Sequence, residues 1–200
     1  MSIIYILTNQ SMPGLIKIGK TENNVTQRMS ELFNTSIPLP FECYYAARVK
    51  DNTAVEKSFH KAFEDFRLNP SREFFKMDPY KAKIILQLLA QEDVTPRDNP
   101  AIDVETEKAL EKVSKSGKFN FMSFGIPPGA TLYYVSDPLI TCTVNDERTV
   151  NFQGQIVSTS RAAVLANASR GGSAKALSGP IWWLYEDETL SNRRERLGSE

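Results

Sequence analysis

Two short apolar runs open the chain, and a polar connection joins them. Residues 3–8 and 15–21 are rich in isoleucine, and the Asn-Gln-Ser-Met-Pro-Gly stretch between them is typical of a turn. From Val25 to Phe33 the apolar residues recur at helical spacing. The pattern predicts an antiparallel hairpin that is followed at once by an amphipathic helix.

The hairpin also predicts which side chains share a face of the sheet. With Leu7 opposite Leu15, Tyr5 lies opposite Lys17, so a phenol and an amine are neighbours. Arg28 falls at the edge of the buried stripe of the next helix and points toward the same pair. We therefore expect three polar groups from three elements to converge.

The rest of the first 92 residues continues as alternating strands and helices. A third strand is predicted at Phe41–Val49, and Asp51-Asn52-Thr53 offers capping residues for a helix from about Ala54 to Phe66. Arg72–Met77 predicts a short edge strand, and Asp78-Pro79 begins a helix that reaches about Gln91. Both faces of the strands are largely apolar, which predicts an α+β domain with helices on both sides of a small, mainly antiparallel sheet.

The composition then changes twice. Residues 92–103 contain two prolines and four acidic residues, which favours a linker, and Val104–Lys115 has a helical pattern. After Lys118, glycine and other turn residues separate short segments; the strands predicted there are Thr131–Val135, Ile140–Val144, Val150–Phe152, Gln155–Val157 and Ile181–Tyr185, with helices from Ser158 to about Ala168 and from about Thr189. The predicted organisation is a domain at 1–92, a linker and connecting helix at 93–117, and a second small β-rich α+β domain at 118–200.

Several motifs in the first domain resemble the GIY-YIG nuclease superfamily. The first motif stands as Ile3-Ile4-Tyr5, the second as Lys17-Ile18-Gly19, and the helix arginine as Arg28. Lysine replaces the tyrosine of the second motif, as in a branch that is common in phages and prophages. That branch also carries Glu and His four residues apart and then Arg-Glu-Phe-Phe, which are here Glu56, His60 and residues 72–75. The motifs occur in the same order over residues 3–79.

The resemblance implies a metal-dependent DNA endonuclease that acts in restriction or phage defence. Glu56 would bind Mg²⁺ or Mn²⁺, and Arg28 would stabilise the charge on the phosphate. Tyr5 would contact or deprotonate the attacking water, with its pKa lowered by Lys17 and the cation. The plainer alternatives are a helix-surface carboxylate for Glu56, a salt bridge for Arg28 and an ordinary strand aromatic for Tyr5.

Three further residues have more than one open interpretation each. Lys17 either places a charge on the phosphate or acts as a base. His60 either relays a proton or binds phosphate, or is a partly buried histidine with a structural partner. Glu73 either orients Arg28 or Lys17, or has a structural role.

The second half resembles the RAMA-type domain through Gly125–Gly129, Asp137-Pro138 and Trp182-Trp183. In that family the role is taken to be reading DNA, with modified DNA as a candidate; a dimerisation or stabilising module is the alternative. The residues expected to contact DNA are Lys20, Arg72, Arg161, Arg170 and Trp182, with Arg193, Arg194 and Arg196 as further arginines for phosphate. One of the two tryptophans is expected in the core, because adjacent strand residues point to opposite sides.

One further motif match does not indicate a binding site. Gly14–Thr21 fits the P-loop pattern G-x-x-x-x-G-K-S/T letter for letter. A P-loop wraps phosphate with a flexible loop that leads into a helix. Here the middle residues predict a strand, and Thr21 leads into a turn, so no nucleotide site is predicted.

Charge and cysteine content restrict the kinds of partner, metal site and cellular compartment that are expected for this protein. The chain has 24 basic and 24 acidic residues, and residues 1–90 hold twelve of the basic and nine of the acidic ones, which permits nucleic-acid contact without requiring it. Cys43 and Cys142 are expected to be buried free thiols in a reducing cytosol, and a single histidine leaves no basis for a structural zinc site. No signal peptide or membrane-length apolar run is seen, so a soluble cytoplasmic protein without a membrane partner is expected.

Two function classes stay open at this point. The near-neutral charge and the lysine in the second motif also fit a non-catalytic nucleic-acid-binding protein on a degenerate nuclease scaffold. For an endonuclease, cutting both strands with one small catalytic domain would need a homodimer or two successive nicks.

Overall fold

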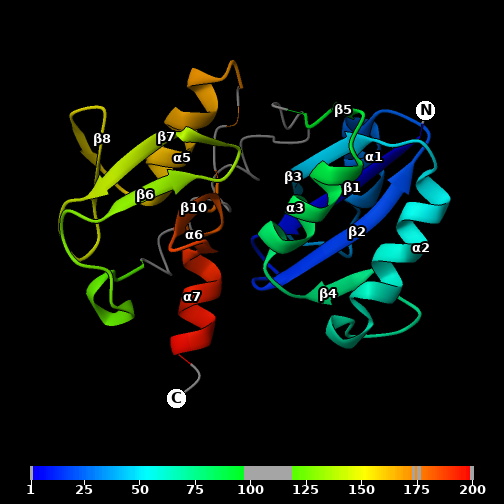
Figure 1. Ribbon diagram of the computed structural model, residues 1–200, viewed down its shortest axis with the longest axis horizontal. Coiled ribbons are helices and arrows are strands. Elements are labelled where there is room, and N and C mark those ends of the chain that lie inside the picture. Colours follow the sequence, from blue (N-terminus) through cyan, green and yellow to red (C-terminus); the bar gives the residue numbers. More distant parts are fainter. Residues whose placement is uncertain (1, 97–118, 173, 175–176, 199–200) are drawn as a thin grey trace. The chain divides into compact units, whose positions relative to one another are not determined.

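The computed structural model describes residues 2–96, 119–172, 174 and 177–198. The chain separates into two compact units, Met1–Thr106 and Glu107–Glu200, here called the first and second units (Figure 1). Each has an antiparallel sheet and helices, which confirms the α+β class. The predicted connecting helix at Val104–Lys115 and most of the predicted linker lie outside the described residues.

The first unit is built on a five-stranded sheet with the order β4-β2-β1-β3-β5. Its strands are β1 (Ile3–Asn9), β2 (Leu15–Thr21), β3 (Phe41–Arg48), β4 (Phe74–Lys76) and β5 (Glu92–Asp93). Its helices are α1 (Val25–Leu32), α2 (Asn52–Ala62) and α3 (Pro79–Leu89), with a 3₁₀ helix η1 (Glu64–Phe66) after α2. The order of elements from β1 to α3 is the predicted one.

The central strand β1 is buried along its whole length, and helices cover both faces of the sheet. Tyr5 and its neighbours on one face pack against Val25 and Met29 of α1. Helix α3 contacts β1 and β3 and lies on the opposite face from α1 (Figure 1). Burial of both faces explains why the strands lack a simple alternation of apolar and polar residues.

The hairpin register differs from the prediction by two residues. Tyr5 pairs with Gly19, and Lys17 pairs with Leu7. The turn is tighter than expected because Asn9 continues β1, and its side-chain oxygen accepts a hydrogen bond from the backbone N–H of Ser11 (2.8 Å). A shift of two residues preserves the alternation of faces, so Tyr5 and Lys17 stay on one face as diagonal neighbours.

The first unit continues past residue 92, where the prediction began a linker. Strand β5 pairs with β3, and the N–H of Val94 donates to the carbonyl of Ala46 (2.9 Å). The hydroxyl of Thr95 accepts a hydrogen bond from the N–H of Ala46 (2.9 Å). These contacts satisfy the outer edge of β3, which would otherwise be left unpaired.

The second unit has a six-stranded sheet with the order β11-β10-β6-β7-β8-β9. Its elements are η2 (Met122–Phe124), β6 (Thr131–Tyr134), β7 (Asp137–Val144), β8 (Val150–Phe152), β9 (Gln155–Val157), α5 (Thr159–Ser169), α6 (Gly179–Trp182), β10 (Trp183–Tyr185), β11 (Glu188–Thr189) and α7 (Leu190–Leu197). The bounds of β8 and β9 are as predicted. The last predicted strand begins two residues late, because α6 extends to Trp182.

The Gly-Ile-Pro-Pro-Gly motif forms turns at the start of this sheet. Gly125 ends η2 with a φ of 69°, and Gly129 has a φ of 84°, a region that favours glycine. The N–H of Gly129 donates to the carbonyl of Val144 (2.7 Å). Turn geometry therefore explains why both glycines stand in the motif.

Cys43 and Cys142 are both buried free thiols, as expected. Burial raises the pKa of Cys142 to about 12, and that of Cys43 is raised further by the same cause. Within the described residues, the helices are all too short or too polar to cross a bilayer.

Candidate functional site

Helix α2 lies along an open edge of the first sheet. In the described part of the chain, β4 pairs with β2 from Leu15 to Lys17 and the N–H of Ile18 donates to the carbonyl of Glu73 (3.2 Å), so β2 is an edge from Gly19 onward (Figure 1). Asp51 caps the start of α2, since it accepts hydrogen bonds from the N–H groups of Thr53 (3.0 Å) and Ala54 (2.9 Å).

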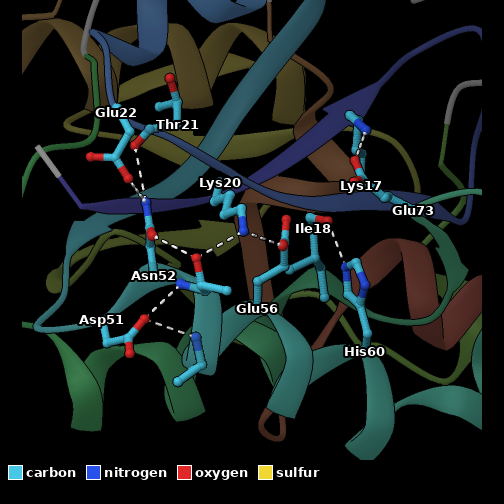
Figure 2. Close-up of polar contacts among 12 residues, drawn as sticks. Lys17, Ile18, Lys20, Thr21, Glu22, Asp51, Asn52, Glu56, His60 and Glu73 are labelled. Carbon is cyan, nitrogen blue, oxygen red and sulfur yellow. Dashed lines mark hydrogen bonds and ion pairs between the residues drawn. The ribbon is translucent and has the colours of Figure 1, made fainter.

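Three side chains of α2, spaced four residues apart, face this edge (Figure 2). Asn52 donates to a carboxylate oxygen of Glu22 (2.8 Å), and His60 Nε2 lies 3.1 Å from the carbonyl oxygen of Ile18. Between them is Glu56. These contacts provide partners for polar groups at the strand edge and fix the helix alongside β2.

Glu56 forms an ion pair with Lys20 across the edge. Glu56 Oε2 lies 3.2 Å from Lys20 Nζ, and the Glu56 side chain is 14% exposed while that of Lys20 is 36% exposed. Lys20 Nζ also donates to Thr53 Oγ1 (2.9 Å). The predicted metal ligand and one predicted DNA contact are thus partners of each other.

Tyr5 reaches the site across Gly19. A Cβ atom at Gly19 would lie 2.6 Å from Tyr5 Oη and 2.8 Å from Cζ, so the phenol ring occupies the space that a side chain would need. Arg28 Nε donates to Tyr5 Oη (3.5 Å), and the other end of the guanidinium is paired with Glu31 (2.9 Å). The two groups converge as predicted.

The expected direction of the Tyr5 pKa is corrected. Burial raises this pKa and outweighs the hydrogen bond and charge of Arg28, which lower it; the carboxylates of Glu73 and Glu56 raise it further. Lys17, which was expected to lower it, is itself paired with Glu73. Tyr5 is therefore a neutral, protonated phenol near pH 7.

Lys17 is a buried cation that is paired with a carboxylate. Its ammonium forms an ion pair with Glu73, which directly precedes β4, and lies 5.4 Å from the centre of the Phe74 ring (Figure 2). The Lys17 side chain is 9% exposed. Of the two cations that Glu73 was expected to orient, it pairs with Lys17, whereas Arg28 pairs with Glu31.

His60 is held by two contacts. Its Nε2 faces the Ile18 carbonyl, which assigns the proton to that nitrogen, and its ring centroid lies 5.3 Å from that of Phe75. These contacts agree with the interpretation of His60 as a partly buried histidine with a structural partner.

Glu56 can hold a divalent cation only with help from other ligands. Among the described residues, no group of three or more His, Cys, Asp or Glu side chains is arranged to bind a metal ion. Mg²⁺ is commonly bound through one or two carboxylates together with substrate phosphates and water. Glu56 fits that mode, with most ligands supplied by the substrate.

The other predicted DNA contacts are distributed over both units. Arg72 is exposed in the turn before β4, Arg161 is exposed in the first turn of α5, and Arg170 ends α5. Trp182 is a correction: it is 4% exposed and stacks on Tyr134 with ring centroids 5.8 Å apart, so no ring face is open for a base. Both tryptophans are buried because the first ends α6 and the second begins β10, so strand alternation does not apply.

Two of the further arginines have structural partners. Arg193 donates to the carbonyl of Phe124 (2.8 Å) and is paired with Glu186 (2.9 Å) and Glu188 (3.1 Å). Arg196 is paired with Glu188. Partial burial raises the pKa of Glu188, but hydrogen bonds from Arg196 and Asn192 and the arginine charges outweigh it, and the net shift is downward.

The contacts of three residues of the site were not assigned from the sequence: Glu31, Gly19 and Asn52. The spacing of Arg28 and Glu31 by three residues is a signal for their pairing. Gly19 was expected only as part of the second motif and Asn52 only as a capping residue, because their contacts depend on the register of β1 and on the path of α2.

The comparison with protein families gives a match for the first unit. No curated protein and no solved structure matches the chain. Residues 2–90 match the family model described as the T5orf172 domain. The matched range includes the residues here called the β2-edge site, which are Tyr5, Lys17, Gly19, Lys20, Arg28, Asn52, Glu56, His60 and Glu73. This part of the chain is therefore similar to the T5orf172 domain, which is found in phage and GIY-YIG-like endonuclease-associated proteins.

Proposed function

We propose that the chain is a metal-dependent DNA endonuclease that hydrolyses phosphodiester bonds in restriction or phage defence. The observation that carries the proposal is the hydrogen bond between the Tyr5 phenol of β1 and the Arg28 guanidinium of α1, with the partly buried Glu56 carboxylate of α2 close enough to act electrostatically on Tyr5. The T5orf172 match over residues 2–90 supports a nuclease-related or DNA-binding role for the same unit.

The side chains have separate tasks in this proposal. Arg28 binds a non-bridging phosphate oxygen, which suits its planar donors. Tyr5, as a protonated phenol, orients the attacking water by hydrogen bonding. Glu56 holds Mg²⁺ or Mn²⁺, a cation that supplies charge stabilisation at the phosphate and the leaving oxygen when bound.

Lys17 acts in this proposal as a fixed positive charge. Its ammonium is paired with Glu73 and lies beside the Phe74 ring, which positions the charge on the Tyr5 face of the sheet.

The function is tested by incubating the purified full chain with modified and unmodified supercoiled plasmid in Mg²⁺ or Mn²⁺. We expect nicked or linear product that disappears on chelation. A nicked intermediate indicates successive cuts, whereas direct linearisation indicates two copies acting together. DNA binding without any cleavage would contradict the endonuclease and favour the non-catalytic nucleic-acid-binding protein.

We also propose that residues 118–200 select the DNA, including modified DNA. Exposed Arg161 at the first turn of α5 supports a phosphate contact there, although the buried Trp182 removes one expected stacking partner. Equal cleavage of modified and unmodified plasmids at a fixed salt concentration would contradict selection by modification.

Lys17→Arg is expected to keep activity within about tenfold of the unsubstituted protein, and Lys17→Ala to lose at least about 100-fold, because a fixed charge is what the site requires. The measurement is the single-turnover cleavage rate across pH 6–9. If Lys17 were a base, arginine would fail at every pH, since it does not deprotonate in that range. Full activity in Lys17→Ala would contradict both roles.

A further inference from the structure

We propose that the ion pair with Lys20 blocks the Glu56 carboxylate in the free protein. When a DNA phosphate binds the Lys20 ammonium, the ion pair breaks and Glu56 becomes available to the divalent cation. Metal and DNA would then bind cooperatively, and neither would load the site efficiently alone. The inference rests on the proposed function and specifies how the same site is regulated.

The contacts of Lys20 show that the ammonium is held in place by α2. Nζ lies 3.2 Å from Glu56 Oε2 and 2.9 Å from Thr53 Oγ1, two residues one turn apart on the helix (Figure 2). A cation that approaches Glu56 therefore meets a carboxylate that is already neutralised. It would also come within a few ångströms of a like charge, which is unfavourable at this partly exposed edge.

The two site lysines differ in their freedom to move. Lys17 is 9% exposed and lies beside the Phe74 ring, whereas Lys20 is 36% exposed at the open edge of β2. A lysine is a compact charge on a flexible stem, and partly exposed ion pairs of this kind contribute little stability. Lys20 can therefore exchange its carboxylate for a phosphate without disturbing the sheet.

The metal site is incomplete without substrate. Among the described residues no further acidic or histidine ligands gather around Glu56 to form a three-ligand site. A hard cation at this place needs oxygen ligands from phosphate and water. The same phosphate that completes the ligand set also provides a negative partner for Lys20, so the two binding events favour each other by reciprocal linkage.

The test measures Mn²⁺ binding by electron paramagnetic resonance in the full chain, without DNA. Lys20→Gln is expected to bind Mn²⁺ about threefold to tenfold more tightly than the unsubstituted protein, because a competing cation is removed. The matched control is Lys61→Gln, which removes an α2 lysine paired with Glu64 (2.5 Å) outside the site and should leave binding unchanged. Glu56→Gln added to Lys20→Gln should remove the gain.

A second measurement adds an uncleavable phosphorothioate duplex. Mn²⁺ affinity should rise more in the unsubstituted protein than in Lys20→Gln, since only the former has a lysine to displace. Equal Mn²⁺ affinity of Lys20→Gln and the unsubstituted protein without DNA would overturn the proposal, and Lys20→Met gives the same comparison with a second side chain. The binding readout does not require cleavage, so failure of the proposed nuclease activity shows separately in the plasmid assay.

Discussion

Glu56→Gln is expected to lower Mg²⁺-dependent DNA cleavage by at least about 100-fold, while DNA binding in the presence of chelator is no weaker than that of the unsubstituted protein. Glutamine has nearly the same shape and can still accept a hydrogen bond from Lys20, but it lacks the charge that holds a divalent cation. Lys20 keeps its second contact with Thr53, so the local structure should persist. The measurement is the single-turnover rate on supercoiled plasmid, with binding followed by fluorescence anisotropy.

Glu64→Gln is the control for this substitution. Glu64 also pairs with a lysine, Lys61, but both side chains are well exposed and lie outside the β2-edge site. We expect its activity to be unchanged, because such pairs contribute little. Full cleavage activity in Glu56→Gln would refute the assignment of Glu56 as the metal ligand.

Gly19→Ala is expected to reduce cleavage by about 100-fold through displacement of Tyr5, because a shift of about 1 Å in a reacting group can cost that much. The new Cβ would lie 2.6 Å from Tyr5 Oη and 2.9 Å from Cε2, and Tyr5 is 1% exposed, so the ring has little room to yield. The substitution should also destabilise the first unit by about 1–3 kcal/mol, as overpacking does. Cleavage rates and chemical denaturation measure the two effects.

A double-mutant cycle separates loss of the Tyr5 hydroxyl from general damage. Tyr5→Phe keeps the ring and removes the hydroxyl that Arg28 contacts. If Gly19→Ala acts through that hydroxyl, the double variant should cleave no more slowly than Tyr5→Phe alone. Strictly additive losses in the double variant would show that Gly19 affects cleavage by another route.

The elements themselves were largely predictable from local pattern. Strands β8 and β9 were located to the residue because turn residues separate short alternating segments. Helix α2 was expected as far as Phe66 but ends at Ala62, with the 3₁₀ helix η1 after it. Hydrophobic spacing does not distinguish a helix from the 3₁₀ turn that extends it.

Two predictions from the sequence, the hairpin register and the strand assignment of the tryptophan pair, were wrong because they depend on contacts that the local hydrophobic pattern does not encode. The hairpin register depended on Asn9, whose side chain forms the turn while its backbone remains in β1. The tryptophan pair was assigned to one strand, although a helix-to-strand junction between Trp182 and Trp183 buries both. In each case one residue's local hydrogen bonding or packing decided the geometry.

The sequence by itself determined the order of elements from β1 to α3, the α+β class and the choice of Tyr5, Arg28 and Glu56 as candidate site residues. The elements follow from periodicity within short segments, whereas the role of Glu56 follows from the resemblance to the GIY-YIG superfamily. The tertiary structure alone decided the partners of the charged groups: Glu73 for Lys17, Glu56 for Lys20, and a backbone carbonyl for His60. The physical reason is that these pairs join residues 36 to 56 positions apart, or a side chain to a strand edge 42 positions away. Such contacts exist only once β4 has stopped short along β2 and α2 has packed against the edge that remains.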